Sequence, residues 1–408
     1  MTIRLRPVIG ALALLLCLSA SSASAQFVHT RGKEIVDASG KPLHLHGTNL
    51  GNWMVREGYM WKMQNGAPES GREIDQFLRE LIGPARTDAF WKQWVDTYIT
   101  RDDIKQIKAA GFDSIRIPFH WKYFDGDGAE GFRLVDHVVQ WSREEGLYVI
   151  LDMHAAPAGQ TGTNIDDSDG WPWLFEDAAA QQKTIDIWRR IAQHYRNNPT
   201  VLGYDLLNEP IPNYPEMMHL NPKLEPLYKR ISAAIRDEDK NHILILGGAQ
   251  WDGNLSVFTR PFDKNIVYEV HTYKSQPDQT TADRFTKQRD RLGAPVWLGE
   301  SGENTDEWIA TFARVLKKND IGWCFWPYKK MDATTSPVTF NQPEHWAEIV
   351  AYSKLDREVA HTKQRVKSRP PQEDIDRAIA TLLENIRFDH ERRNMGYIRA
   401  LIPDTKLH

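Results

Sequence analysis

The segment Val201-Leu-Gly-Tyr-Asp-Leu-Leu-Asn-Glu-Pro210 has the pattern of a short apolar strand that ends in a carboxylate and a proline. A second run, Pro295-Val-Trp-Leu-Gly-Glu-Ser301, is built in the same way. Short apolar runs bounded by breakers are typical of strands buried on both faces of a parallel sheet. Because burying a carboxylate costs desolvation free energy, the positions of Glu209 and Glu300 indicate that a carboxylate is required there. Together they predict a paired-carboxylate site at one end of a parallel barrel.

Runs of this kind recur along the chain and alternate with amphipathic or helix-rich stretches. The eight strand candidates cover residues 43–50, 114–119, 148–154, 201–208, 242–248, 265–273, 295–301 and 322–328. The helix candidates between them include residues 101–110, 134–145, 181–196, 224–236, 281–291 and 306–318. Eight such units predict an α/β fold, a single (β/α)8 TIM barrel with parallel strands.

Other segments fall outside this rhythm. Residues 27–42 predict an N-terminal β-hairpin on the barrel floor, with a turn signal at Asp37-Ala-Ser-Gly40. The stretches 53–100 and 155–177 exceed ordinary loop lengths, so we expect long βα loops that shape a cleft. The first of them contains helix-like pieces at residues 72–82 and 87–99.

The last part of the chain is charged and has a helical pattern. After the break at Pro370-Pro371, an apolar stripe follows at helical spacing, formed by Ile375, Ile379, Leu382, Leu383 and Ile386. Such a stripe is usually covered by other parts of the same protein. Residues 361–408 therefore predict a charged helical extension packed on the barrel, and residues 26–360 the domain that carries the active site. A helix that binds a partner protein is the alternative.

The first residues have the features of a secretory signal peptide. A basic start precedes an apolar run at residues 8–18, and Ala23-Ser-Ala25 is a small-x-small cleavage site. We therefore expect residues 1–25 to be removed, a secreted or periplasmic protein, and no membrane attachment after cleavage. Removal leaves Cys324 as the one cysteine, which excludes an internal disulfide in the mature chain.

Composition narrows the range of partners. The formal net charge of −4 argues against nucleic acid as a ligand. The 15 tryptophans favour a carbohydrate ligand, because sugar rings stack on exposed indoles. We expect a monomer that needs no cofactor.

The ends of the strand candidates carry the residues with chemical potential. In a parallel barrel, the active site is formed where the carboxyl ends of the strands meet. The polar and aromatic residues at these ends are Arg116, His154, Asn208, Glu209, His271, Tyr273, Glu300 and Trp326. This set suits cleavage of a glycosidic bond, which needs an acid at the leaving oxygen and a nucleophile or base on the other face of the sugar.

The residues around the two glutamates suit supporting tasks. Arg116 beside one carboxylate would keep it ionised. His271 and Tyr273 can orient the pair by hydrogen bonds, and Asn208 can bind the sugar 2-hydroxyl. Trp326 offers a platform for the reacting ring.

The ordered set of motifs resembles glycoside hydrolase family 5, the cellulase-like members of the retaining four-seven barrel superfamily. The motifs in chain order are Arg116-Ile-Pro, Asp152-Met-His154, Asn208-Glu-Pro210, His271-Thr-Tyr273, Gly299-Glu300 and Trp326. The resemblance covers residues 43–328 and implies a retaining double displacement, with Glu209 as acid/base and Glu300 as nucleophile. The resemblance also implies that the two glutamates are supported by Arg116, His154, Asn208, His271, Tyr273 and Trp326.

A further segment, Gly47-Thr-Asn-Leu-Gly-Asn-Trp-Met-Val-Arg-Glu57, resembles the exo-β-1,3-glucanases of this family. This likeness implies that Glu57 binds a hydroxyl of the innermost sugar. The Trp171-Pro-Trp173 loop and the Lys329-Lys330 pair lie outside that pattern. A β-1,4- or β-1,3-glucan is the expected substrate, a β-mannan or another β-glycan is the alternative, and endo or exo action stays open.

A metal-dependent hydrolase on the same barrel is the enzymatic rival. His44-Leu-His46 on the first strand candidate is a His-x-His pair of the kind that binds zinc. The fourth and fifth strand candidates lack the lysine or histidines that would complete such a site, so we expect no metal. A sugar-binding protein without activity is disfavoured because both glutamates are present.

Overall fold

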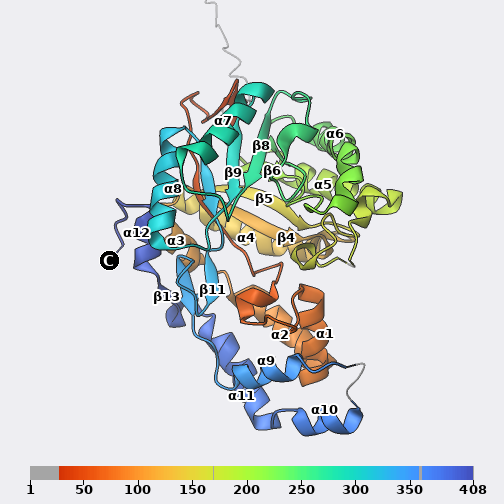
Figure 1. Cartoon of the computed structure of the whole chain (residues 1–408). Coiled ribbons are helices and arrows are strands. Elements are labelled where there is room, and N and C mark those ends of the chain that lie inside the picture. Colours follow the sequence, from red (N-terminus) through yellow and green to blue (C-terminus); the bar gives the residue numbers. More distant parts are fainter. Residues whose placement is uncertain (1–26, 169, 358–360, 408) are drawn as a thin grey trace, which may run out of the picture.

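The computed structural model describes residues 27–168, 170–357 and 361–407, so the predicted signal peptide lies outside the described residues. Eight parallel strands close into a barrel in the order β10-β3-β4-β5-β6-β7-β8-β9 (Figure 1). They are β3 (His46–Asn49), β4 (Ser114–His120), β5 (Tyr148–Ala155), β6 (Val201–Asp205), β7 (Ile243–Gly247), β8 (Ile266–His271), β9 (Val296–Glu300) and β10 (Trp323–Phe325). The predicted (β/α)8 architecture is confirmed.

Helices cover the outside of the barrel, as the amphipathic stretches predict (Figure 1). They are α3 (Arg101–Ala110), α4 (Ala129–Glu145), α5 (Ala178–Tyr195), α6 (Asn221–Glu238), α7 (Gln279–Leu292) and α8 (Asp306–Lys318). The Asp278 side chain caps the start of α7 by accepting the Thr281 N–H, and Gly293 ends this helix at a φ of 69°. Between β7 and β8 the chain makes only the short 3-10 turn η7 (Leu255–Val257).

The N-terminal hairpin closes the amino end of the barrel. Strands β1 (His29–Arg31) and β2 (Glu34–Val36) pair antiparallel, and Thr30 N–H donates to Asn265 Oδ1 at 2.8 Å. The buried side chains beneath the hairpin form one apolar cluster, made of Val28, Ile35, Leu45, Ile150, Leu202, Ile243, Ile245, Val267, Trp297 and Cys324. The hairpin turn itself lies at Gly32, and the predicted turn signal at residues 37–40 forms the next turn instead.

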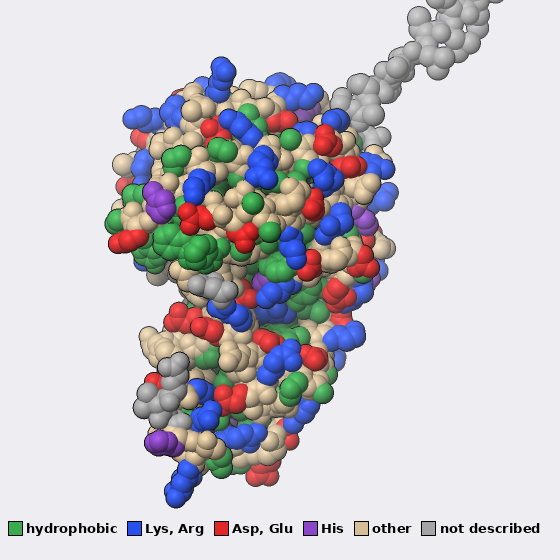
Figure 2. Space-filling model, turned by 90° about the vertical axis from the view of Figure 1, so that its right-hand side faces the viewer, with side chains coloured by type: hydrophobic (Ala, Val, Ile, Leu, Met, Phe, Trp, Pro, Cys, Tyr) green, Lys and Arg blue, Asp and Glu red, His purple; other side chains and the backbone are tan. Residues whose placement is uncertain are grey.

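A second lobe faces the carboxyl end of the barrel. The insertion after β3 folds into η2 (Gly58–Trp61), α1 (Gly71–Ile82) and α2 (Pro84–Thr97), which confirms its predicted helical pieces. Later in the chain, α9 (Trp346–Ser353), α10 (Thr362–Ser368) and α11 (Gln372–Asn385) join the same lobe. Figure 2 shows the hollow that separates this lobe from the barrel.

The C-terminal helices divide between the two lobes. The apolar stripe of α11 is packed against α2, and Arg86 Nη2 lies 2.6 Å from Asp376 Oδ1 at this contact. In contrast, α12 (Met395–Leu401) packs on α8, and Ile402 contacts Gly111 at the end of α3. The part of the extension that covers the barrel is therefore α12, and the division of the chain at residue 360 stays a prediction.

A small sheet connects the C-terminal segment to the end of β10. It contains β11 (Lys329–Met331), β12 (Val338–Phe340) and β13 (Arg392–Arg393). At the start of β11, the fully buried Lys329 ammonium lies 2.8 Å from Asp103 Oδ1 and 2.5 Å from Glu391 Oε2. Among the described residues, no helix has the length and apolar character needed to cross a bilayer.

We expect Lys329→Met to lower the free energy of unfolding by about 3–5 kcal/mol, because two buried carboxylates would lose their shared cation. Urea denaturation followed by circular dichroism measures this change. Lys92→Met is the matched control, since Lys92 pairs with Asp96 on an exposed helix face. It should cost about 0–1 kcal/mol. Equal effects of the two substitutions would contradict a structural role for the buried ion pair.

Candidate active site

The two strand-end glutamates face each other at the carboxyl end of the barrel. Glu300 is the last residue of β9, and Glu209 follows β6. The His271 Nδ1 atom lies between them, 2.9 Å from Glu209 Oε1 and 3.6 Å from Glu300 Oε2. One oxygen of each glutamate and one ring nitrogen of His271 all lie within 4.8 Å of one another.

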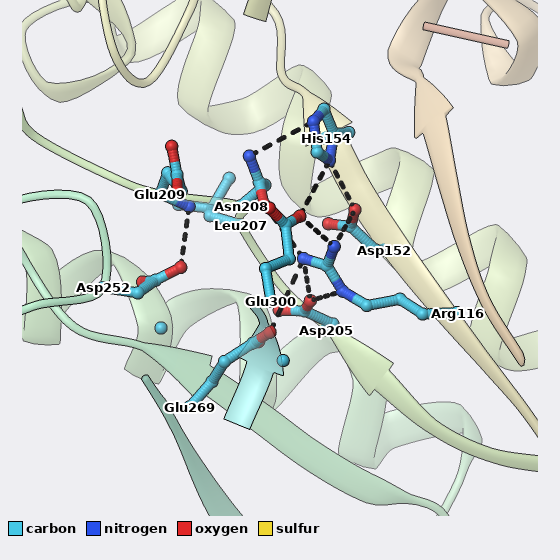
Figure 3. A network of polar contacts seen from close by, with 12 residues as sticks. Arg116, Asp152, His154, Asp205, Leu207, Asn208, Glu209, Asp252, Glu269 and Glu300 are labelled. Atoms are coloured by element: carbon cyan, nitrogen blue, oxygen red, sulfur yellow. Dashed lines mark hydrogen bonds and ion pairs between the residues drawn. The ribbon is translucent and has the colours of Figure 1, made fainter. Parts of the chain in front are cut away.

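Arg116 from β4 lies beneath this pair and has no exposed surface (Figure 3). Its Nη1 donates to Glu300 Oε1 at 2.6 Å and lies 3.2 Å from Asp152 Oδ2. Its Nε donates to Asp205 Oδ2 at 2.8 Å, and Nη2 lies 3.6 Å from Glu269 Oε1. One guanidinium is therefore shared by four buried carboxylates.

Strand register brings these groups to similar depths in the barrel. Asp152 and Asp205 are direct partners in the β5–β6 pairing. The β8–β9 pairing shifts by one residue after Val270, which sets His271 opposite Glu300. The skipped residue is Gly299, where an added Cβ would lie 1.4 Å from Glu269 Oε1. A glycine is therefore required beneath Glu300.

The backbone at Glu209 is held in an unusual conformation. Its φ of 48° lies in the left-handed region, which is uncommon for residues other than glycine. The Glu209 N–H donates to Asp252 Oδ2 at 3.0 Å, and Gln160 Nε2 donates to the Asn208 carbonyl at 2.9 Å. These bonds fix the strained turn that aims the Glu209 side chain, an arrangement often found at functional sites.

The surroundings separate the pKa values of the two glutamates. Burial raises the pKa of Glu209, and the hydrogen bond with His271 offsets this only in part. Burial also acts on Glu300, but the charges of His271 and Arg116 outweigh it, so the pKa of Glu300 is lowered. The pKa of His271 lies well above its usual value despite burial, because Glu300 and Asp252 favour the imidazolium. Glu300 is thus the more acidic and Glu209 the less acidic member of the pair.

The remaining predicted residues lie around the two glutamates. Tyr273 donates its hydroxyl to Glu300 Oε2 at 2.8 Å. Asn208 accepts from Arg116 Nη2 at 3.0 Å, and its amide nitrogen lies 3.4 Å from His154 Nε2. The rings of His154 and Trp326 are stacked, with centroids 5.3 Å apart and planes within 4°. The indole N–H of Trp326 donates to the hydroxyl of Tyr59 at 2.7 Å.

A cavity of about 490 Å³ opens above the glutamates. Six of the nine predicted site residues line it: Glu57, His154, Glu209, Tyr273, Glu300 and Trp326. The other three, Arg116, Asn208 and His271, lie behind the lining and bond the glutamates or each other. Burial and the nearby charges of Glu300 and Glu303 raise the pKa of Glu57 well above its usual value.

Several residues around the glutamates are not among the predicted site residues. Asp205 and Glu269 stand inside apolar strand runs, and the cost of burying such charges is the signal that marks them. Burial and the charge of Glu269 hold the pKa of Asp205 well above its usual value. Tyr59 and the Lys330–Glu303 ion pair, which lies at the cavity, have no sequence signal of this kind.

The His-x-His pair lies at the other end of the barrel. His46 is the first residue of β3, where burial lowers its pKa to about 4, and His44 lies 3.9 Å from Asp320. Neither joins the group of Glu209, His271 and Glu300, whose atoms are close enough to ligate a metal ion. At that group, the charges of Arg116 and the His271 imidazolium oppose a bound cation.

Comparisons with known proteins agree with this geometry. The model of the family described as "Cellulase (glycosyl hydrolase family 5)" matches residues 70–332. A Beta-xylosidase of Phanerodontia chrysosporium is 28% identical over 83% of this chain and 77% of its own length. Endoglucanase C of Acetivibrio thermocellus is 26% identical over 60% of this chain and 88% of its own.

The fold comparison gives the same architecture. The crystal structure of AoRut superposes with a TM-score of 0.59 and 20% identity, covering 71% of this chain and 89% of that one. At this identity the likeness concerns the fold alone. The family match extends over more than half of the chain and includes both barrel strands that carry the facing glutamates. The chain therefore belongs to glycoside hydrolase family 5 and is a glycoside hydrolase.

Proposed function

We propose that the protein is a secreted or periplasmic β-glycosidase that cleaves a β-glucan-type polysaccharide or oligosaccharide by retaining double displacement. The observation that carries this proposal is the approach of Glu209 and Glu300 to within 4.8 Å. Retaining enzymes hold their carboxyl groups about 5–5.5 Å apart, whereas inverting enzymes leave about 6.5–9.5 Å for a water molecule. The short separation favours direct attack by one glutamate.

In the first step, Glu300 attacks the anomeric carbon while the bond to the leaving oxygen breaks. Arg116 and Tyr273 each donate to one oxygen of Glu300, which orients the carboxylate for attack. Glu209 transfers its proton to the leaving oxygen, a task that its raised pKa suits. The products of this step are a glycosyl ester on Glu300 and a Glu209 carboxylate.

In the second step, water replaces Glu300 at the anomeric carbon. The negative charge of Glu300 contributes to the raised pKa of Glu209, and the ester has lost that charge. The pKa of Glu209 therefore falls in the intermediate, and its carboxylate accepts the proton of the attacking water. The ester bond breaks, and both glutamates regain their starting protonation states.

The cavity residues suit a sugar ring in the reacting position. Glu57, which lines the cavity, hydrogen-bonds a sugar hydroxyl, and the amide of Asn208, just behind the lining, binds the 2-hydroxyl. Trp326, held by His154 and Tyr59, provides an aromatic face for the ring.

The identity of the sugar is tested by a substrate panel. The printed names of the relatives include an endoglucanase, a Beta-xylosidase and a probable glucan 1,3-beta-glucosidase, so β-1,3-, β-1,4- and mixed-linkage glucans and xylo-oligosaccharides belong in the panel. A β-mannan tests the alternative substrate.

The stereochemistry of the first product tests retention. Release of β-configured products, followed by NMR immediately after cleavage, is expected; α-configured first products would contradict retention.

Substitution of the glutamates is expected to separate their roles. Glu300→Gln should abolish turnover of an activated aryl β-glycoside. Glu209→Ala should reduce kcat/KM for the glycan by about 10²–10⁴-fold and affect the activated glycoside much less, because a good leaving group needs no acid. Glu303→Gln is the matched control, since Glu303 lines the same cavity and should leave turnover in place. Near-normal rates for Glu300→Gln would refute the nucleophile assignment.

The pH dependence follows from the two pKa shifts. Activity requires ionised Glu300, so it is lost as pH falls through the lowered pKa of this group. Activity also requires protonated Glu209, so it is lost as pH rises through the raised pKa of that group. A plot of log kcat/KM against pH should therefore be bell-shaped. In Glu209→Ala the basic limb should disappear for the activated glycoside; its persistence would assign that limb to another group.

Chelation tests the metal-dependent alternative. Activity on the panel substrate should be unchanged after dialysis against excess EDTA, since Arg116 and His271 supply the positive charge beside the glutamates. If EDTA abolished activity and added zinc or another divalent cation restored it, the result would favour a metal-dependent hydrolase.

A further inference from the structure

Exposed aromatic residues gather on loops that the proposed mechanism does not use. Among the residues that the structure describes, the large hydrophobic side chains with high exposure are Trp173 (48%), Tyr214 (44%), Met218 (44%) and Val366 (68%). The first three belong to the loops after β5 and β6. Leaving large apolar groups in water is unfavourable, so a cluster of them at one place commonly marks a binding surface.

Ring contacts form two groups, which the turn η6 (Pro215–Leu220) connects because Tyr214 precedes it and His219 belongs to it. We call the two groups together the aromatic rim: Trp171, Trp173, Tyr214, His219 and Trp251. Trp171 lies 6.3 Å from Trp173 and is stacked on His219 at 6.2 Å, measured between ring centroids. Tyr214 meets Trp251 edge to face at 5.3 Å. Figure 2, seen from the side of α5 and α6, shows hydrophobic side chains gathered at the edge of the barrel above the hollow between the lobes.

The aromatic rim is attached to the loops that hold Glu209. The Glu209 N–H donates to the carboxylate of Asp252, the residue after Trp251. Gln250 N–H, on the other side of Trp251, donates to the Ile211 carbonyl at 2.6 Å. The backbone bonds that position Glu209 therefore also position the Tyr214–Trp251 pair.

The rim and the sugar-binding part of the cavity lie on opposite sides of the barrel. The rim loops follow β5, β6 and β7, whereas Glu57, Tyr59 and Trp326 follow β3 and β10. In the proposed mechanism, Glu209 protonates the oxygen that leaves with the departing part of the substrate. That part must extend past Glu209, on the rim side.

We propose that the aromatic rim binds the sugar rings of the departing part of a β-glycan. This assignment rests on the proposed function and adds the surface that binds the second half of the substrate. Sugar rings have apolar faces, which stack on aromatic rings, and hydroxyl edges, which hydrogen-bond to charged groups. The rim has side chains of both kinds. Around the aromatic faces, Glu176 accepts from Trp171 Nε1 at 3.1 Å and pairs with Lys223 at 3.0 Å, so charged groups border the rings.

The experiment compares two substrates that share the reacting sugar and differ in the departing group. One is the oligosaccharide that the panel selects, and the other is the β-glycosyl fluoride of its reacting sugar, which has no departing ring. Trp173→Ala should lower kcat/KM for the oligosaccharide by about 3- to 10-fold, the loss expected for one aromatic stacking contact. The ratio of the two kcat/KM values should fall by nearly the same factor, and Trp173→Phe should restore part of it.

Trp308→Ala is the matched control, because Trp308 lies on the outer helix α8. It should leave the ratio of the two kcat/KM values unchanged. An equal loss on both substrates in Trp173→Ala, or no loss on the oligosaccharide, overturns the rim assignment. Wild-type protein that cleaves neither substrate overturns the proposed function itself, a result that is distinct from a change in the ratio.

Discussion

The buried guanidinium of Arg116 is the interaction on which the site depends. A charged group without exposed surface is tolerated only where opposite charges surround it, and four carboxylates from four strands do so here. Closure of the barrel brings side chains from β4, β5, β6, β8 and β9 together at its carboxyl end. The charged site therefore depends on the closed sheet.

Excess negative charge around Arg116 has to be balanced by protons, and the surroundings determine where they lie. Burial and the charge of Glu269 raise the pKa of Asp205, and the charges of Glu300 and Asp252 raise the pKa of His271, whose ring lies between Glu209 and Glu269. The result is an asymmetric pair, in which Glu300 has two strong donors and Glu209 has one. Two chemically identical side chains thereby acquire different proton affinities.

The sequence predicts the barrel because buried parallel strands and amphipathic helices have distinct periods, and it predicts the site because strand ends converge. It fails where an outcome depends on register or on the choice of partner. The opposition of His271 and Glu300 comes from a one-residue shift that no local pattern marks. The stripe beginning at Ile375 indicates a covered face, but its pattern contains nothing about α2, which covers it. The His44–His46 pair is a further case. The sequence pattern does not show that both histidines lie at the amino end of β3, whereas the glutamates lie at the carboxyl end of the barrel.

The burial of Lys329 against Glu391 has a consequence for biosynthesis. The ribosome adds Glu391 about sixty residues after Lys329, which corresponds to a delay on the order of 3–12 s at ordinary elongation rates. During that interval Lys329 lacks one of its two carboxylate partners, and the seam between α3 and α8 lacks α12. The barrel can therefore reach its final form only after translation has passed well beyond its last strand.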